Sequence, residues 1–303
     1  MISKKPKVSI IINCFNGETF LKKCLLSILN QTYENWEVIF WDNRSTDNSK
    51  KIFQNFKSKK FKYFKAKKFT NLYTARNLAL RKVTGEIVMF VDVDDEWLRD
   101  KIDKQIQVFK KNKNINIVSS NFLREKKFFF LKLRKKFLLK KNKNILNTFD
   151  LIKNYQIGWS TIAIKKRLFN SRSKNFNEES HMISDFEFMI NKSTQNKVFF
   201  INEPLVVYRD HSSQLSRKNF FIQIDQYLKW CENLSRNKKL SRYKKYIYSS
   251  EKYTFYKDLK DFKNNNSLKK LLFTLFSSKS LNFKLKIFLY YLFPKFFIYY
   301  LAT

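Results

Sequence analysis

The stretch EIVMFVDVDDEW, residues 86–97, contains the feature that decides the fold. Its first seven residues, EIVMFVD, form an apolar run with the length and composition of a strand buried on both faces. Four carboxylates stand at or just after the end of this run: Asp92, Asp94, Asp95 and Glu96. Carboxylates so close together repel one another, so they normally need a cation or protons to hold them together. The sequence therefore predicts a buried strand that delivers a cation-binding cluster to its carboxyl end.

Working outward from this stretch, strand-like and helix-like segments alternate along the first 120 residues. Strands are predicted at 7–15, 36–42, 61–66, 86–92 and 115–120, and helices at 17–31, 45–56, 71–83 and 96–112. Most of these strands are apolar on both faces, which indicates a mostly parallel, twisted sheet of the α/β class covered by helices on both sides. Ligands bind beyond the carboxyl ends of such strands. Asp42 and Asp92, which both end a predicted strand, are expected at that edge.

The pattern changes after residue 121. The segment 124–143 mixes bulky apolar side chains with many basic ones. Further elements are a strand followed by a short helix at 157–169, a helix at 183–193, and two short strands broken at Pro204 within 197–211. From about 217 the chain is helical, basic and aromatic. We therefore divide the chain into 1–215, with halves 1–120 and 121–215, and a helical extension, 216–303.

The composition is strongly basic. The 303 residues include 62 Lys+Arg against 25 Asp+Glu, a formal net charge of +37, yet 44% are hydrophobic, so the chain is no disordered polyelectrolyte. Part of the lysine excess fits the codon bias of an AT-rich genome; the rest favours an anionic partner such as nucleic acid, an acidic membrane or a phosphate-bearing substrate. Three scattered cysteines without metal-ligand spacing fit a reducing cytosol: Cys14, Cys24 and Cys231.

The D-x-D-D cluster suits a hard cation better than acid–base chemistry. Its surroundings should leave the three aspartates ionised, and Mg²⁺ or Mn²⁺ is commonly held by one or two carboxylates plus substrate phosphates. Arg76, in the segment TARN, supplies a fork-shaped cation for a phosphate or a carboxylate. The sequence holds neither a G-x-G-x-x-G nor a P-loop motif, so it supports neither a dinucleotide-binding fold nor a P-loop fold.

Five ordered segments now carry a resemblance to a known family. The chain resembles a family 2 glycosyltransferase with the GT-A fold, continuously over about residues 7–120 and then in shorter stretches. The segments are VSIIINCFNGETFLKKCLLSILNQTYENWEVIFWDNRSTDNS (8–49), ARNLALRKVTGEIVMFVDVDDEW (75–97), WSTIAIKKRLF (159–169), FNEESHMISDFEF (176–188) and EPLVVYRDHSSQLS (203–216). Five motifs in the expected order are far more specific than a lone D-x-D.

The resemblance implies roles for individual residues. Asp42 corresponds to the acid that hydrogen-bonds the nucleotide base, and Asp92 and Asp94 correspond to the D-x-D pair. Of that pair, Asp92 would lie near the donor ribose and sugar, and Asp94 on the metal. Asp185 corresponds to the catalytic base of an inverting enzyme. Four further residues are expected to help bind the nucleotide sugar: Asn13, Arg76, Arg209 and His211. Of these, Arg209 and His211 would lie near the diphosphate and the acceptor.

The sequence departs from the family pattern at three places. Asn13 stands where the first strand usually ends in proline, and Ser184 stands where the usual pair of acids includes a glutamate. The common D-D-G-S reads Asp42-Asn43-Arg44-Ser45, which loses an acid and a turn glycine. Because Arg44 adds bulk and charge beside the expected base pocket, the identity of the nucleotide is left open.

The resemblance therefore predicts a metal-dependent, inverting, hexosyltransferase-like enzyme that uses Mn²⁺ or Mg²⁺. It would move a sugar from a nucleotide-diphosphate donor, most simply UDP-linked, to a glycan or lipid-linked acceptor in bacterial surface-polysaccharide assembly. Residues 1–120 would bind the nucleotide sugar and 121–215 the acceptor. Two alternatives stay open: a nucleotidyltransferase on a related sheet, and a non-catalytic basic module that binds nucleic acid or anionic membrane. For the enzyme no nucleic-acid partner is expected.

The C-terminal stretch LNFKLKIFLYYLFPKFFIYYLAT, residues 281–303, is almost wholly apolar and aromatic from Ile287. Pro294 and Lys295 interrupt it, so it suits the membrane interface better than a span of about 20 apolar residues. The stretch KKFFFLKLRKKFLLKK (126–141) is a second possible contact with an anionic membrane surface. The expected location is cytoplasmic, either free or peripheral on the inner membrane. In the alternative, the tail packs on the catalytic domain.

Overall fold

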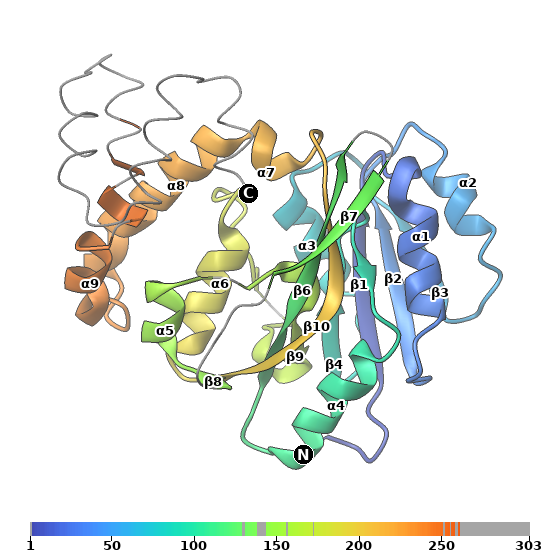
Figure 1. The fold of residues 1–303 in the computed structure, drawn as a ribbon, viewed down its shortest axis with the longest axis horizontal. Coiled ribbons are helices and arrows are strands. Elements are labelled where there is room, and N and C mark those ends of the chain that lie inside the picture. The colour runs from blue at the N-terminus through green and yellow to red at the C-terminus, as the bar shows by residue number, and fades with distance from the viewer. Residues whose placement is uncertain are drawn as a thin grey trace. The chain divides into compact units, whose positions relative to one another are not determined.

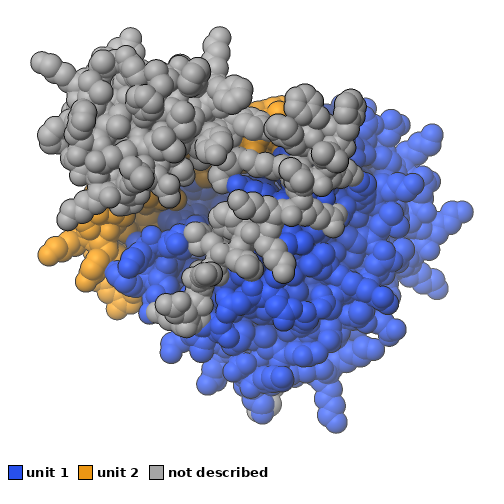
Figure 2. Space-filling view, viewed as in Figure 1, with its two compact units in different colours: residues 1–210 blue, residues 211–303 orange. Residues whose placement is uncertain are grey.

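The computed structural model describes residues 2–128, 131–137, 144–155, 157–171 and 173–250, and a few positions up to 260. The chain forms two compact units, Met1–Asp210 and His211–Thr303, shown in blue and orange in Figure 2. The division lies close to the predicted one after residue 215.

The first unit is built on one ten-stranded sheet with the strand order β3-β2-β1-β4-β9-β6-β10-β5, to which β7 and β8 attach (Figure 1). Four parallel strands form one half, and each ends at the same edge: β1 (Val8–Cys14), β2 (Trp36–Asp42), β3 (Phe61–Lys65) and β4 (Ile87–Phe90). Every residue of β2 and β4 is buried, as the apolar sequences predict.

Helices cover this parallel half because alternate strand residues face opposite sides of the sheet. Ile10 and Ile12 pack in one core cluster with Leu21 and Leu25 of α1 (Glu18–Leu29). Three more helices belong to this half: α2 (Ser49–Gln54), α3 (Leu72–Leu80) and α4 (Lys101–Lys111). Asn71 caps α3 by accepting hydrogen bonds from the amides of Tyr73 and Thr74.

The other half of the sheet is mixed. β6 (Ile117–Phe128) runs parallel to β10 (Val198–Asp210), while β9 (Ala163–Lys165) runs antiparallel to both β4 and β6. Three shorter or outer strands pair antiparallel: β5 (Glu96–Trp97), β7 (Leu131–Phe137) and β8 (Ile145–Leu146). The helical elements here are α5 (Thr148–Lys153), η1 (Trp159–Thr161), η2 (Lys166–Leu168) and α6 (Ser184–Ser193).

Three predicted elements are corrected. The helix expected at 96–112 begins only at Lys101, because Glu96 and Trp97 pair with β10 as β5. The two strands expected around Pro204 are one strand, β10, whose register with β6 shifts at the proline. Proline lacks the amide that a regular ladder needs, and an irregular register accommodates it without ending the strand. The strand at 157–169 is short and lies between two 3₁₀ turns, η1 and η2.

The second unit is helical over its described part, as predicted from about residue 217. Its elements are α7 (Leu215–Lys218), α8 (Phe220–Glu232), η3 (Asn233–Arg236), η4 (Ser241–Tyr243) and α9 (Lys244–Tyr248). Within the described ranges, no helix has both the length and the apolar character needed to cross a bilayer. The tail at 281–303, expected at a membrane interface, lies outside the described residues, as do the side chains of 126–143.

Candidate active site

The acidic residues after β4 form a tight loop with two different environments. The amide of Asp95 donates to the carbonyl of Asp92 (3.0 Å), which closes the turn. The Asp92 side chain is 42% exposed, whereas Asp95 is 2% exposed. Burial raises the pKa of the Asp95 carboxyl well above its ordinary value, and the neighbouring charges of Asp94 and Asp92 raise it further. The loop therefore turns Asp95 into the protein and leaves Asp92 half-buried.

Arg76 is the partner of Asp92. Its Nη2 atom donates to Asp92 Oδ1 at 2.9 Å, and the guanidinium lies 5.2 Å from the ring centres of both Tyr73 and Trp159. The arginine is only 3% exposed. Of the two partners that the sequence left open, phosphate or carboxylate, the structure supplies the carboxylate. A guanidinium held between two aromatic rings fixes the orientation of Asp92.

Asp185 lies in the first turn of α6, and its Oδ1 accepts the amide of Phe186 at 2.7 Å. Its charge acts on groups from other segments. Burial raises the pKa of Tyr73, and the charge of Asp185 raises it further; the same two causes act on Tyr155. Burial is also the main cause that raises the pKa of Asp92, to which Asp94 and Asp185 add and which Arg76 opposes. Asp185 is also hydrogen-bonded to Tyr73, whose ring centre lies 5.2 Å from the Arg76 guanidinium, so α6 is linked to α3 and, through Arg76, to the acidic loop.

The donor atoms at this place fit a divalent cation. Asp92 and Asp94 are carboxylates two positions apart on one loop, and carboxylate oxygens are the hard ligands that Mg²⁺ and Mn²⁺ prefer. In the described part of the chain, no three His, Cys, Asp or Glu side chains converge in the manner of an all-protein metal cage. Mg²⁺ and Mn²⁺ sites of the kind expected here are completed by water and substrate phosphates.

A second polar group lies at the end of the neighbouring strand. Asp42, 1% exposed, accepts the amide of Ser45 at 2.7 Å and the hydroxyl of Tyr63 from β3. Burial and this hydrogen bond raise the pKa of Tyr63. Asn13 lies one position before the strand residue that pairs with Asp42, and its Nδ2 atom is buried with no hydrogen-bond partner among the described residues. A buried donor without a partner is a reason to expect a ligand or water there.

Arg209 is a further contact of the acidic loop. It is 6% exposed, and its Nη1 donates to the carbonyl of Asp94 at 2.9 Å. Its other nitrogens face Glu96 and Glu125, the latter at 3.4 Å. His211 is the first residue of the second unit, where its Nδ1 lies 2.8 Å from Ser213 Oγ. The geometry therefore brings Asp92, Arg76, Asp185 and Arg209 around one loop, with Asp42 and Asn13 at the next strands, and leaves His211 in the other unit.

Sequence reasoning missed Ser160 and Tyr63. Ser160 lies in η1, is 3% exposed, and makes three hydrogen bonds to the loop 92–97. A weak signal existed, because WST opens one of the five family-like segments. The alternation of FKYFKA predicted the strand that carries Tyr63 but gave no sign that its hydroxyl reaches Asp42.

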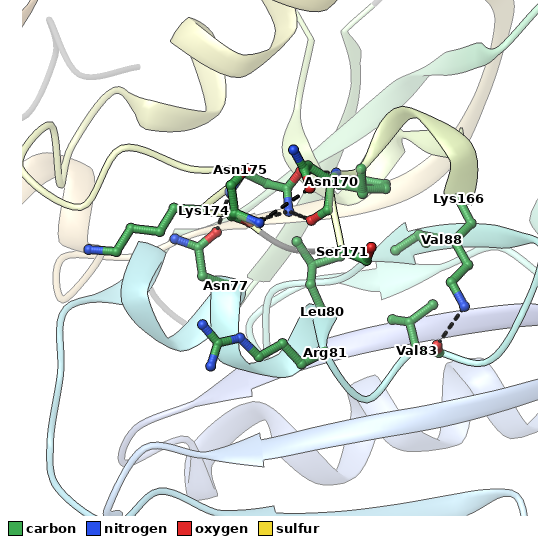
Figure 3. Close-up of a pocket in the computed structure, with 12 residues that line it drawn as sticks. Asn77, Leu80, Arg81, Val83, Val88, Lys166, Asn170, Ser171, Lys174 and Asn175 are labelled. Atoms are coloured by element: carbon green, nitrogen blue, oxygen red, sulfur yellow. Dashed lines mark hydrogen bonds between the residues drawn. The ribbon is translucent and has the colours of Figure 1, made fainter.

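Figure 3 shows a separate pocket of about 180 Å³ between α3 and the segment 166–175. None of the predicted site residues lines it. Two polar side chains that line it already form hydrogen bonds within the protein. Asn77 accepts the amide of Asn175 at 3.0 Å, and Lys166 Nζ donates to the carbonyl of Val83 at 2.9 Å. This pocket plays no part in the site.

Comparison with known proteins identifies the family. The model of the family described as "Glycosyl transferase family 2" matches residues 9–208. The chain belongs to the family 2 glycosyltransferases. Its relatives include an Escherichia coli protein named UDP-Glc:alpha-D-GlcNAc-diphosphoundecaprenol beta-1,3-glucosyltransferase WfgD, 30% identical over 70% of this chain and 81% of that one. Another is the Campylobacter jejuni GalNAc(5)-diNAcBac-PP-undecaprenol beta-1,3-glucosyltransferase, 29% identical over 90% and 89%.

Solved structures agree with the fold of a family 2 glycosyltransferase. Staphylococcus aureus TarS 1–349 in complex with UDP-GlcNAc matches with a TM-score of 0.65 and 15% identity, over 93% of this chain and 78% of that one. The mannosyltransferase PcManGT from Pyrobaculum calidifontis, in complex with GDP-Man and Mn²⁺, matches with a TM-score of 0.64 and 15% identity, over 99% and 86%. The predicted family and GT-A fold class are confirmed, and neither the nucleotidyltransferase nor the non-catalytic module finds support.

Proposed function

We propose that this family 2 glycosyltransferase moves a sugar from a UDP-linked donor to a glycan carried on a polyprenyl diphosphate, in the assembly of a bacterial surface polysaccharide. The observation that carries the proposal is the meeting of Asp92, Arg76 and Asp185, from three separate segments, at the carboxyl edge of the sheet. The names of two relatives, which specify diphosphoundecaprenol-type acceptors and in one case UDP-Glc, support the substrate classes.

The donor nucleotide is proposed to bind at the ends of β1 and β2. The Asp42 carboxylate, held by Tyr63 and Ser45, accepts a hydrogen bond from the base. Asn13, whose buried Nδ2 has no hydrogen-bond partner in the described part of the chain, donates to an oxygen of the nucleotide. Arg76 acts through Asp92, because it is buried against that carboxylate and covered by two rings.

Asp94, with Asp92 beside it, is proposed to hold Mn²⁺ or Mg²⁺ together with the donor diphosphate. When bound, the ion would neutralise charge on the departing nucleotide diphosphate. Arg209, which donates a hydrogen bond to the Asp94 carbonyl, is proposed to keep the loop in place. His211 is still proposed to act near the diphosphate or the acceptor.

Asp185 is the proposed catalytic base. It takes the proton from the acceptor hydroxyl as that oxygen forms a bond to C1 of the sugar and the bond from C1 to the diphosphate oxygen breaks. One carboxylate opposite the leaving group serves a single displacement, which inverts C1 and needs no covalent intermediate. Asp185 Oδ1 already accepts the Phe186 amide, which orients the carboxyl group on α6.

A lipid-linked acceptor is presented at a membrane surface, so a cytoplasmic enzyme that binds the inner membrane peripherally fits this chemistry. The apolar tail at 281–303 and the basic stretch at 126–141 remain the proposed contacts, on sequence grounds. No nucleic-acid partner is proposed.

A donor screen tests the function directly. Purified protein with Mn²⁺ is given a panel of nucleotide sugars, and hydrolysis is read without acceptor, then transfer with a polyprenyl diphosphate glycan. We expect turnover of UDP-sugars that EDTA abolishes, and that Asp94→Ala also abolishes. Asp103→Ala, on the α4 surface and outside the site, is the matched control. Undiminished turnover in excess EDTA would refute the metal-dependent mechanism.

A further inference from the structure

The described part of the second unit carries a dense basic surface. Six of the ten residues at 236–245 are Lys or Arg, against 62 of 303 in the whole chain. No Asp or Glu occurs between Asn233 and Ser250, and all six basic side chains are exposed: Arg236, Lys238, Lys239, Arg242, Lys244 and Lys245. We call these six side chains the basic surface. This local density is about three times the average of the chain, and residues 59–68, with six lysines in ten, equal it.

The basic surface is part of a folded scaffold. Leu234, Leu240 and Ile247, interspersed among the basic residues, are each 1% exposed. The Tyr248 hydroxyl donates to the carbonyl of Cys231 at 3.1 Å, which ties α9 to α8. Because the apolar residues anchor the segment inward, its backbone is already ordered, and binding has to order only the exposed basic side chains.

None of the six basic side chains forms an ion pair with a carboxylate among the described residues. The lysine-rich run at 57–68 differs in one respect, because Lys62 is paired with Glu37 at 2.7 Å. Contacts between a cation and an aromatic ring occur in both places, since Lys60 lies 4.6 Å from the Trp36 ring centre and Arg242 lies 5.0 Å from that of Tyr243. Tyr246, within the same segment and 54% exposed, adds an amphipathic ring of the kind enriched at headgroup level.

We propose that the basic surface binds the anionic headgroups of membrane lipids. The proposal rests on the proposed function, which requires a lipid-carried acceptor. It is favoured over nucleic acid because the same unit ends in the apolar stretch 281–303, which has no use on a nucleic acid but supplies the second signal that stable membrane attachment needs. Each basic residue near an acidic membrane strengthens binding roughly fivefold.

The test uses the full-length protein and sedimentation with vesicles of phosphatidylcholine alone or mixed with phosphatidylglycerol. The quadruple variant Lys238→Gln, Lys239→Gln, Arg242→Gln, Lys244→Gln is compared with a control that removes the same charge elsewhere: Lys50→Gln, Lys51→Gln, Lys57→Gln, Lys59→Gln. The control lysines are all exposed. We expect at least tenfold weaker binding to the anionic vesicles for the first variant and less than about twofold for the second.

Equal losses in both variants, or equal binding to neutral and anionic vesicles, would overturn the proposal. So would binding of single-stranded RNA that depends on the basic surface when vesicle binding does not. Transfer to a detergent-dispersed acceptor is measured in parallel and should be unchanged. Because sedimentation needs no turnover, failure of the proposed function appears as absent transfer in the wild type, separately from the membrane result.

A second inference rests on Ser160. Its Oγ accepts the amide of Asp92 at 3.0 Å and donates to the Asp95 carboxylate. Its carbonyl accepts Trp97 Nε1 at 3.0 Å. One buried residue thus contacts both ends of the acidic loop, with Asp94 between them. We infer that Ser160 is a positioning residue that sets the loop geometry on which cation and diphosphate binding depend.

Ser160→Ala would leave the buried Asp92 amide and Asp95 carboxylate short of a partner, so the loop should relax. Ser119→Ala is the matched control, because Ser119 is fully buried and its Oγ lies 2.8 Å from Thr161 Oγ1 but not at the loop. Both variants should lower the melting temperature, whereas only Ser160→Ala should weaken binding of UDP with Mn²⁺, by about tenfold or more, in calorimetric titration. Ser160→Thr, which keeps the hydroxyl, should recover most of that loss.

Equal UDP affinities of the two alanine variants would show that Ser160 has only a structural role. If Ser160→Ala does not fold, a Ser160→Thr variant that folds yet binds UDP as weakly as Asp94→Ala would equally contradict the inference. A wild type that prefers GDP would change the proposed donor, and the same comparison would then be made with GDP.

Discussion

At the scale of single residues, the proposed chemistry depends most on Asp185. Asp185→Asn keeps the shape and the bond to the Phe186 amide but removes the proton acceptor. We expect kcat to fall on the order of 10²-fold or more, with donor affinity little changed. Steady-state kinetics and donor titration measure the two effects separately. Glu187→Gln is the control, since Glu187 accepts from Ser180 (2.9 Å). A collapse of donor binding with kcat intact would make Asp185 a binding residue.

Arg44 provides a residue-scale prediction about stability. Its backbone has φ 72°, in the left-handed region, at the place where the family pattern has glycine. A residue with a side chain is strained in this backbone conformation by about 1–2 kcal/mol. Glycine avoids the strain but loses more conformational entropy on folding, which costs about 0.5–1 kcal/mol of stability. Because Arg44 is exposed, Arg44→Gly should stabilise the fold by about 0.5–1 kcal/mol in chemical denaturation. Arg81→Gly, at an exposed position with φ −66°, should instead destabilise it.

The residues that sequence could predict are those whose chemistry follows a recognisable pattern. Asp42 ends β2 and Asp92 follows the end of β4 by two residues, so their place at the sheet edge followed from the strand assignments. Ser160 and Tyr63 could not be predicted in the same way, because they act through hydrogen bonds to residues far away in the sequence, such as Ser160 to Asp95 across 65 positions and Tyr63 to Asp42 across 21. Hydropathy patterns carry no information about such pairs. The partner of Arg76 was likewise open until the fold placed Asp92 beside it.

At the scale of elements, β2 contains a buried charge that makes stability depend on pH. Glu37 is 2% exposed; burial would raise its pKa, but hydrogen bonds from Lys62, Ser9, Thr84 and Lys7 lower it well below its usual value. Glu37 therefore stabilises the fold fully above the ordinary glutamate pKa, and this contribution is lost as pH falls through the lower folded value.

Glu37→Gln should accordingly lower the free energy of unfolding at pH 7 by on the order of 1–2 kcal/mol, allowing for screening of the half-exposed lysines. It should also flatten the loss of stability between about pH 4 and pH 2, a range below the ordinary glutamate pKa. Denaturation at a series of pH values measures both effects. Glu34→Gln, at a site 77% exposed, is the control and should change little. An unchanged pH slope in Glu37→Gln would contradict this assignment.

Elements were predictable where local sequence suffices to form them. The strands and helices up to α3 carry their own apolar periodicity, and the structure has them within a few residues. β5 could not be predicted, because two residues form a strand only when β10, about 110 positions later, pairs with them. The predicted strand break at Pro204 was wrong for a related reason. Proline alone indicates the end of a strand, but β10 pairs with β6 on both sides of Pro204, and this pairing keeps the strand continuous.

At the scale of the whole molecule, charge and apolar character are distributed unevenly. The acidic loop lies in the first unit, whereas the basic surface and the apolar tail both belong to the second. The net charge of +37 alone indicated an anionic partner without saying where it binds. The fold supports the proposed contact at the basic surface, because it shows six basic side chains exposed on an ordered scaffold.

The two membrane contacts proposed for the second unit differ in their response to salt. Attraction between exposed basic side chains and anionic lipid is screened over about 8 Å at physiological ionic strength and about 3 Å at 1 M, whereas burial of apolar side chains is not weakened by salt. A chain that ends at Ser280 keeps the basic surface and lacks the tail. It should bind anionic vesicles at low salt and be released at 1 M salt. The full-length protein should retain part of its binding at 1 M salt, and the quadruple glutamine variant should lose mainly the low-salt component. Sedimentation across a salt series measures all three. If the shortened chain bound as the full-length protein does at every salt concentration, the tail would not be an anchor, and binding would depend on the basic surface alone.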